Sequence, residues 1–290
     1  DVVGGAHRWD YQARSASALA GVGAAPDYAI DSTAVGGIYA NRIRLIATEA
    51  GVGVRLLGDA AAVADDLTIT AAGDLELRAS ISAARDLAIA AGSAGAGDLT
   101  ASDTSLTSGR DLALAAAGKT TLTGGAIIAS GNLSLTSAAL ADTTSATALA
   151  NANQRYAGGA MSFDIAGAAT LGGTSYGAAG SLTGLVGSLA TTGSGFVYSN
   201  GGALTLTAGT GNLDLGGYAV TSPGALTLDA AGFVSNAGNG TVVSDNGAVT
   251  VRAGAGLNNA GTIAANAGGV ALQLGGTSAN SGTIVAQGDL

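Results

Sequence analysis

A pentapeptide in the middle of the chain matches the active-site turn of serine hydrolases. Gly173-Thr-Ser-Tyr-Gly177 fits the Gly-x-Ser-x-Gly pattern, in which a sharp strand-to-helix turn exposes the serine as a nucleophile. Such a serine needs a general base, and the only histidine of the chain, His7, lies far upstream. No helical pattern follows Ser175, and such pentapeptides arise by chance in a chain with 49 glycines. We therefore expect a corner turn here and predict no catalytic residue.

Two further sets of residues could suggest a metal site. His7 lies close to Trp9 and Asp10, but one histidine without any cysteine cannot supply the usual zinc ligands. Aspartate also precedes leucine repeatedly, at Asp66, Asp74, Asp86, Asp98, Asp111 and Asp289. The Gly-Gly-x-Gly-x-Asp phrase of calcium-binding repeats is missing. We expect these carboxylates to hydrogen-bond local backbone at corners, and we predict no metal and no cofactor.

The asparagines admit a chemical and a structural interpretation. Asn132-Leu-Ser134 and Asn239-Gly-Thr241 fit the N-glycosylation acceptor pattern, although such matches are expected by chance in a chain rich in Asn, Ser and Thr. A ladder of stacked asparagines at one corner is predicted for Asn236, Asn258, Asn259 and Asn280. The chain has no phosphate-binding loop and no dinucleotide fingerprint. The sequence leaves the binding residues unknown and does not decide whether Asn132 or Asn239 is glycosylated.

Composition limits the classes of partner. The chain has 290 residues, with 11 Lys+Arg against 20 Asp+Glu, so its net charge is −9. Nucleic acid is an unsuitable partner because phosphate binding needs a basic stripe, whereas the only lysine is Lys119. Residues 165–213 carry no charge, but they contain no run of about 18 apolar residues, so no membrane-spanning segment is expected. The absence of cysteine suits export as an unfolded chain.

The elements that position all these residues are repeated short strands. A turn residue, a leucine, a small or polar residue and another Leu or Ile recur, which is the alternation of a strand with one apolar face. The phrase occurs at 66–70, 74–78, 86–90, 111–115, 132–136, 203–207 and 225–229. Its step is 20 residues from Leu67 to Leu87 and 23 from Leu226 to Val249. We predict an all-β, parallel β-helix with about 20–23 residues per coil and about 14 coils in all.

The regularity of the repeat varies along the chain. Residues 1–58 are of higher complexity, residues 59–290 contain the coils, and residues 138–200 lose the register. The middle stretch is predicted either to form coils with irregular corners or to protrude, at 138–156, as a loop or short helix. Loops of repeat proteins often carry binding, so this stretch is the first place to look for function.

The segment Ala29–Val54 resembles the filamentous haemagglutinin family, the large exoproteins of bacterial two-partner secretion systems. The later Gly-Asp/Asn-Leu-x-Leu and Asn-x-Gly-Thr-Ile phrases are similar to the family's haemagglutinin repeats. The resemblance implies a right-handed parallel β-helix that is secreted or displayed at the bacterial cell surface. It also implies a fragment in which residues 1–58 end the secretion-type domain and residues 59–290 begin the repeat shaft. The family's Asn-Pro-Asn-Gly signature is absent, so recognition by the outer-membrane transporter is expected from sequence upstream of Asp1.

The same resemblance leaves two functions open. The first is the structural shaft of a filamentous adhesin that attaches to a host-cell receptor or glycan. The alternative is the stalk of a contact-dependent growth-inhibition toxin, which delivers a C-terminal toxin to a target bacterium. A third class, a β-helical polysaccharide lyase, would need clustered Asp, Lys or Arg on one coil face, which the dispersed arginines do not provide. We therefore predict that this segment is not an enzyme.

Overall fold

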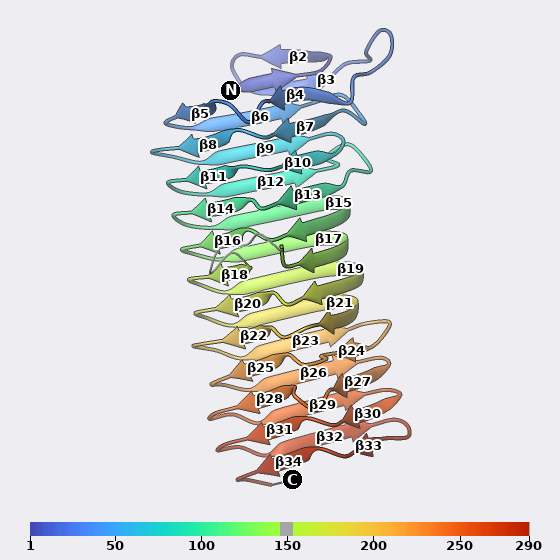
Figure 1. The fold of residues 1–290 in the computed structure, drawn as a ribbon. Helices are drawn as coiled ribbons and strands as arrows, with labels where there is room; N and C mark the ends of the chain where they lie inside the picture. The colour runs from blue at the N-terminus through green and yellow to red at the C-terminus, as the bar shows by residue number, and fades with distance from the viewer. Residues whose placement is uncertain (146–152, 290) are drawn as a thin grey trace.

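The computed structural model describes residues 1–145 and 153–289, and these residues contain strands and no helix. The chain winds as a stack of coils, and each regular coil contributes one short strand to each of three faces of the rod (Figure 1). We call these faces A, B and C in the order in which the chain visits them. Neighbouring coils are joined by parallel ladders, so successive strands of a face lie one above the other.

The strands of face A are β1 (Val2–Gly4), β6 (Ile43–Ala47), β9 (Leu67–Ala71), β12 (Leu87–Ala91), β15 (Leu112–Thr123), β17 (Leu133–Thr143), β19 (Met161–Gly172), β21 (Leu182–Thr192), β23 (Leu204–Ala208), β26 (Leu226–Ala230), β29 (Val249–Ala253) and β32 (Val270–Leu274). Face B holds β4 (Tyr28–Ser32), β7 (Gly53–Leu56), β10 (Leu75–Leu77), β13 (Leu99–Ser102), the second halves of β15, β17, β19 and β21, then β24 (Leu213–Asp214), β27 (Phe233–Asn236), β30 (Gly256–Asn259) and β33 (Ala279–Asn280).

Face C is a separate 12-stranded sheet. Its strands are β5 (Gly37–Ala40), β8 (Asp59–Ala62), β11 (Ser80–Ala83), β14 (Ser105–Ser108), β16 (Ala126–Ala129), β18 (Gln154–Ala157), β20 (Ser175–Ala178), β22 (Phe196–Ser199), β25 (Ala219–Ser222), β28 (Thr241–Ser244), β31 (Thr262–Ala265) and β34 (Thr283–Ala286). The remaining strands, β2 (His7–Asp10) and β3 (Ser15–Ala18), form an antiparallel hairpin at the N-terminal end of the rod (Figure 1).

The core follows from the alternation of the repeated phrase. Leu67 lies beside Leu87, Leu87 beside Leu112, and Leu112 beside Leu133, and all four side chains are buried. Because side chains of a strand alternate between its two faces, every second residue enters the interior and stacks on its equivalent in the next coil. Each such leucine, when fully buried, contributes roughly 1.5–3 kcal/mol. The predicted parallel β-helix is confirmed.

The predicted number of coils is wrong. The solenoid has about 11 turns rather than 14. Residues 1–27 add only β1 to the stack and otherwise form the hairpin and its connections. Some coils are also longer than 21 residues: Leu106 pairs with Ile81, and Arg155 pairs with Ile127 across the longest step of face C. Fewer coils therefore account for the same chain length.

The stretch 138–200 continues the ladders in the part that the structure describes. Strands β17, β19 and β21, like β15 before them, are 11 or 12 residues long and run through both face A and face B, where the other described coils have two short strands. Register shifts between Ser137 and Leu140, and between Ile165 and Ala168, bend these long strands at the corner. The described parts of this stretch form coils with irregular corners. The predicted loop or short helix at 138–156 includes residues 146–152, which lie outside the described residues, so that account stays a prediction.

The junction predicted at residues 58 and 59 lies within the continuous stack. Strands β7 and β8 on its two sides pair with β10 and β11 of the next coil. Residues on the two sides of this junction therefore belong to one continuous stack. The end of a secretion-type domain at this point stays a prediction. Within residues 1–145 and 153–289 no helix has the length and apolar character needed to cross a membrane.

Candidate functional site

The structure does not bring the residues of the serine-hydrolase pattern together. Gly173 has a φ of 70° and forms a corner, as predicted, and Ser175 begins β20 on face C. Strand β21, not a helix, comes next. His7 lies in the hairpin at the N-terminal end of the rod, where its Nδ1 is 2.8 Å from the carbonyl oxygen of Gly5 (Figure 1). Ser175 therefore has no histidine beside it.

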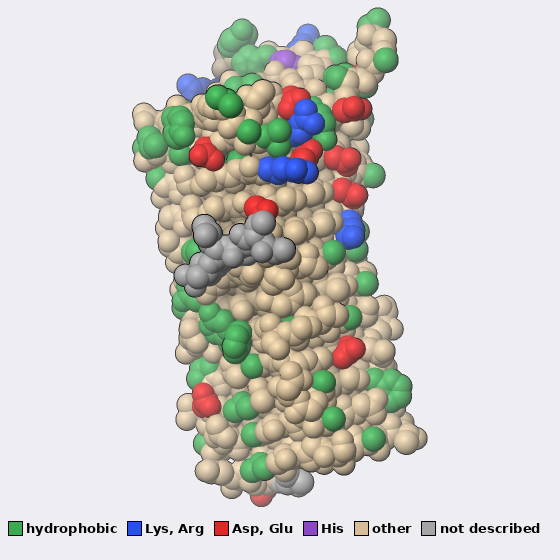
Figure 2. All heavy atoms as spheres, in the orientation of Figure 1, with side chains coloured by type: hydrophobic (Ala, Val, Ile, Leu, Met, Phe, Trp, Pro, Cys, Tyr) green, Lys and Arg blue, Asp and Glu red, His purple; other side chains and the backbone are tan. Residues whose placement is uncertain are grey.

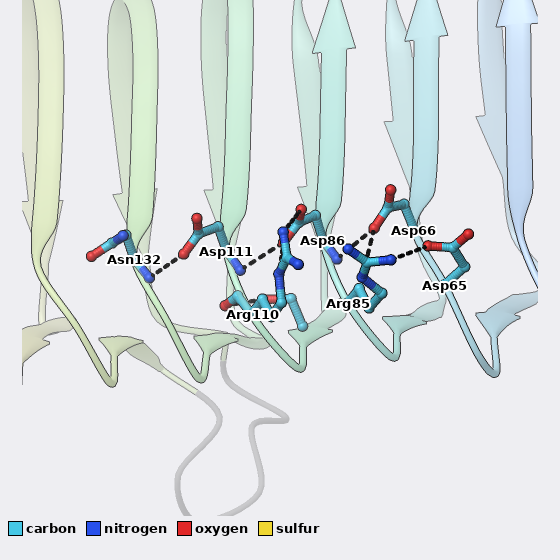
Figure 3. A network of polar contacts seen from close by, with 8 residues as sticks. Asp65, Asp66, Arg85, Asp86, Arg110, Asp111 and Asn132 are labelled. Carbon is cyan, nitrogen blue, oxygen red and sulfur yellow. Dashed lines mark hydrogen bonds and ion pairs between the residues drawn. The ribbon is translucent and has the colours of Figure 1, made fainter.

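Three of the aspartates that precede leucine, Asp66, Asp86 and Asp111, form a ladder along one corner of the solenoid (Figure 3). Asp74 and Asp98 stand at another corner, before face B, where they accept the N–H groups of Asp98 and Lys119 at 2.8 and 2.7 Å. The side-chain oxygen of Asp66 accepts the N–H of Asp86 at 3.2 Å, and Asp86 accepts that of Asp111 at 3.2 Å. Asp111 in turn accepts the N–H of Asn132 at 2.8 Å, and Asn132 that of Ala160 at 2.9 Å. The expectation of local backbone partners is wrong, because each carboxylate bonds the backbone of the next coil.

Arginines accompany this aspartate ladder on the outside. Arg110 donates two hydrogen bonds to Asp86, at 3.0 and 2.7 Å, and Arg85 donates one to Asp65 at 3.3 Å (Figure 3). Among the described residues no group of three or more His, Cys, Asp or Glu side chains is arranged to hold a metal ion. The carboxylates instead cap coil corners and pair with guanidinium groups.

The predicted asparagine ladder exists at the B–C corner of the last coils, with one member fewer. Asn236 donates to Asn259 at 2.9 Å, and Asn259 donates to Asn280 at 2.8 Å. Asn258 is the error: it points outward from β30 and is exposed, because it lies one position out of phase with the inward residues. Of the two asparagines in acceptor patterns, Asn239 is exposed, and the side-chain oxygen of Asn132 accepts the N–H of Ala160 in the aspartate ladder.

The most distinctive site is a set of buried polar side chains that we call the core charge cluster: Asp142, Arg155 and Tyr176. Asp142 stands in an inward column between Leu122 and Leu171, and Arg155 stands below Ile127. Charged residues thus replace aliphatic residues at two inward positions of one coil. The sequence carried a signal for this, because Arg155-Tyr-Ala157 occupies the place of Ile127-Ile-Ala129 in the repeat. We did not predict the cluster from that signal.

The core charge cluster joins three consecutive coils. Arg155 donates to both carboxylate oxygens of Asp142, at 2.9 Å from Nε and 2.7 Å from Nη2. It also donates to the carbonyl oxygens of Gly125 and Gly124 in the preceding coil, at 2.7 and 3.0 Å. From the following coil, the Tyr176 hydroxyl donates to Asp142 at 2.5 Å. Each charge is therefore satisfied by more than one partner.

Burial dominates the electrostatics of this cluster. The side chains of Arg155 and Asp142 are 1% and 0% exposed. Burial raises the pKa of Tyr176 well above its ordinary value, and the Asp142 carboxylate raises it further by disfavouring a second negative charge. Burial alone would lower the pKa of Arg155, but the charge of Asp142 outweighs it and raises the pKa. The arrangement keeps one fixed ion pair and one neutral phenol.

The cluster can fix register, but it has no route to a substrate. Its atoms lie inside the solenoid, closed off from solvent by the strands around them. A one-residue slip of β18 would turn Arg155 outward and leave Asp142 buried without a counter-charge. Uncompensated burial of a charge is strongly destabilising, so the pair disfavours every alternative pairing of this coil. A buried polar group used in this way specifies the alignment of strands rather than a reaction.

Comparison with known proteins finds similarity between parts of this chain and much longer proteins. No family model and no solved structure matches the chain. Curated relatives do match, among them "tRNA nuclease CdiA-2" of Burkholderia pseudomallei, 48% identical over 77 residues, which is 27% of this chain and 2% of that protein. "16S rRNA endonuclease CdiA" of Enterobacter cloacae is 32% identical over 163 residues, 51% of this chain and 5% of that protein. "Toxin CdiA" of Yersinia pestis is 51% identical over 57 residues, 20% of this chain and 2% of that protein.

The predicted resemblance to filamentous haemagglutinin-like exoproteins of two-partner secretion systems is confirmed. The three relatives named above are CdiA proteins, and the chain folds as the parallel solenoid that the resemblance implied. The chain spans only about 2–5% of their length, so their named activities are those of much longer proteins.

Proposed function

We propose that this chain is a stalk segment of a CdiA-type contact-dependent growth-inhibition exoprotein, a stiff spacer that holds other parts of the protein away from the cell surface. The observation that carries the proposal is similarity over half of the chain to a protein of that name, combined with an uninterrupted ladder along the described coils. The similarity favours the toxin-delivery stalk over the filamentous adhesin, whereas the ladder suits either function.

The physical basis of the spacer is the coil-to-coil ladder. Backbone groups pair with the next coil both within strands and at corners, as where Gly131 donates to Arg110 and Gly232 donates to Gly211. Each coil contacts mainly its neighbours, so length can be added without changing the cross-section. This architecture suits a protein that is exported through an outer-membrane transporter and winds up coil by coil outside the cell, displayed at the bacterial surface.

We also propose that the segment itself carries no catalytic activity. Its buried charges are enclosed, and the relatives whose printed names include a nuclease are matched over a few per cent of their length. Incubation of the purified chain with RNA, DNA and polysaccharides tests this: unchanged substrates are expected, and cleavage products would overturn it.

The experiment for the stalk function uses bacteria that produce the full-length exoprotein containing this chain. They are grown with susceptible bacteria of the same species, either mixed or separated by a membrane permeable to protein. Loss of viable target cells only in the mixed culture is the expected result. Undiminished target cells, together with strong attachment of the producers to epithelial cells, would instead support the adhesin.

The dependence of target-cell inhibition on stalk length gives a second test of the stalk function. Residues 204–225 form one register-matched coil, since Leu204 pairs with Leu226. Deleting them should preserve the ladder and retain inhibition with a slightly shorter stalk. Deleting residues 214–234, which match the 21-residue step from Asp214 to Ser235 on face B, also keeps the register and should behave alike. Removing half a coil should abolish export or inhibition.

A further inference from the structure

The outer surface of face C carries a group of aromatic side chains that neither the core nor the ladders explain. Tyr156, Gly177 and Tyr198 are consecutive members of one outward column on β18, β20 and β22. Phe196 stands beside them in the neighbouring outward column, between Ser175 and Ala219. Phe196 is 56% exposed, because its neighbours in the column are too small to cover the ring. We call Tyr156, Phe196 and Tyr198 the aromatic platform.

The ring of Tyr198 is laid across the sheet rather than standing away from it. A Cβ atom placed on Gly177 would lie only 2.5 to 2.6 Å from its Cε1 and hydroxyl oxygen, and closer still to Cζ. The tyrosine therefore rests over the one residue of the column without a side chain, and Gly177 is buried beneath it although it points outward. The hydroxyl end of the Tyr198 ring therefore lies against the backbone of Gly177, and the half-buried ring is held close to the sheet. An aromatic ring held in place on a sheet surface is suited to stacking on a ligand.

The surroundings of the platform are uncharged. Residues 165–213 contain no Asp, Glu, Lys or Arg, and the neighbours on face C are Gln154, Ser175 and Thr221. Figure 2 shows hydrophobic side chains gathered over β20 and β22, with charged side chains concentrated toward the N-terminal end. A charged partner would lose hydration here without gaining a counter-charge. The platform instead offers partly exposed aromatic rings together with hydroxyl and amide groups.

We propose that the aromatic platform binds an uncharged polysaccharide chain of a cell surface. The apolar C–H face of a pyranose ring stacks on an aromatic ring, while its hydroxyl groups bond to groups such as the hydroxyls of Tyr156, Tyr198 and Ser175. Parallel strands repeat at about 4.8 Å, so the two tyrosines, two coils apart, form an extended track for successive sugars of a linear chain. This inference does not depend on toxin delivery.

The chain provides its own matched control. Tyr39 on β5 also faces outward on face C and lies over a glycine, since a Cβ on Gly37 would be 2.6 Å from its ring. It is 67% exposed, yet it has no second aromatic residue in the adjacent coil, where Ala61 occupies the column. Tyr39→Ala removes an exposed ring of the same face without touching the platform.

The test measures binding of the purified 290-residue chain to two neutral oligosaccharides, cellohexaose and chitohexaose, by calorimetry, with a sulfated dextran as the charged comparison. Saturable binding of a neutral oligosaccharide at up to millimolar concentration, unaffected by salt, is expected. Tyr198→Ala and Phe196→Ala should each weaken it about tenfold or more, as expected for loss of a stacking ring worth about 1.4 kcal/mol, and Tyr39→Ala should not. Unchanged thermal unfolding of the variants shows that the solenoid is intact.

Three results would overturn the proposal. The first is no binding of either neutral oligosaccharide. The second is binding of sulfated dextran alone, which would assign the surface to anionic ligands. The third is concentration-dependent self-association that Tyr198→Ala abolishes, which would make the platform an interface between copies of this chain.

Discussion

Charged side chains serve two different purposes in two regions of this solenoid. In the aspartate ladder, from Asp66 to Asn132, they lie at an outer corner in water, and each carboxylate or amide caps the backbone of the next coil. In the core charge cluster, Asp142 and Arg155 lie inside the rod and bond to each other. An exposed ion pair gains little because water competes for both charges, whereas a buried pair cannot be broken without leaving a charge unsolvated.

The same inward position of the repeat can hold either a leucine, which stabilises the core, or a polar residue, which specifies how neighbouring coils align. The inward column that holds Leu122 and Leu171 also holds Asp142, and the last coils place Asn236 and Asn259 at the same B–C corner. Leucine at such a position stacks on any aliphatic neighbour, so it tolerates many registers. A charge or an amide accepts only a partner with the right chemistry, so it selects one register.

The largest effect is expected from breaking the core charge cluster on one side. Arg155→Ile and Asp142→Leu, made separately, should each lower the free energy of unfolding by about 3–5 kcal/mol, because each leaves a buried charge alone. The double variant should recover most of that loss, since both residues then match their aliphatic columns. Urea unfolding followed by circular dichroism measures all three. Equal losses in the single and double variants would contradict the argument.

The next effect concerns the alkaline limit of stability. Burial, and then the Asp142 carboxylate, raise the pKa of Tyr176 above its unfolded value of about 10. A raised folded pKa means that the stabilising contribution is complete below pH 10 and is lost as the pH rises toward the folded pKa. Melting temperatures measured from pH 9 upward should therefore fall, and Tyr176→Phe should make this fall shallower. An identical alkaline decline in the variant would count against a neutral buried phenol.

A smaller loss is expected at the asparagine ladder. Asn259→Ala removes the hydrogen bonds to Asn236 and Asn280 and should destabilise the last coils by about 1–3 kcal/mol. Hydrogen exchange of the β27, β30 and β33 amides measures this locally. Asn258→Ala, one residue away but exposed, is the control and should change exchange little. Equal effects of the two substitutions would remove the distinction between inward and outward asparagines.

The exposed arginines should matter less still. Arg110→Ala removes a two-bond contact with Asp86, but the Arg110 side chain is half exposed and well hydrated. Its urea midpoint should shift less than that of Asn259→Ala, and the shift should vanish in 1 M salt, where the Debye length is about 3 Å. The Arg155→Ile loss should persist in the same salt. A shift for Arg110→Ala that does not depend on salt would contradict the distinction between the exposed aspartate ladder and the buried core charge cluster.

The smallest effect is the acid dependence of the aspartate ladder. Partial burial pushes the pKa of Asp86 up, but the Asp111 N–H and the Arg110 guanidinium outweigh it and hold the pKa below its ordinary value. A lowered folded pKa gives stability that is present above the unfolded value of about 3.9 and is lost as the pH falls through the folded pKa. Asp86→Asn should therefore flatten the acid decline of the urea midpoint slightly. An unchanged acid decline would show that Asp86 contributes nothing there.

Much of the fold was predictable because alternation and period are local properties of the sequence. The Leu-x-Leu phrases and their steps of 20 to 23 residues indicated short strands stacked in parallel, and the inward residues Leu67 and Leu87 are where the alternation places them. The asparagine ladder was predictable for the same reason. Asn258 was misplaced because adjacent residues of a strand point to opposite sides, and the Asn258-Asn259 pair does not say which one points inward.

Other features depend on which residues meet across coils. The aspartates looked like local corner caps, but their partners are residues of the next coil, such as Asp111 for Asp86. The core charge cluster needs Asp142 and Arg155 to enter the interior from two faces at one level, and the aromatic platform needs Tyr198 to follow Gly177 by one coil.

The sequence alone determined that this chain stacks repeated strands around an aliphatic core, because burial depends on the period with which leucine returns. Only the tertiary structure decided how polar and aromatic residues of different coils combine. The number of residues in each coil sets which side chains lie one above another. This number varies, as the pairs Ile81–Leu106 and Ile127–Arg155 on face C show. Contacts across a variable step cannot be read from residue types, because a shift of one position turns a side chain from the core to the solvent.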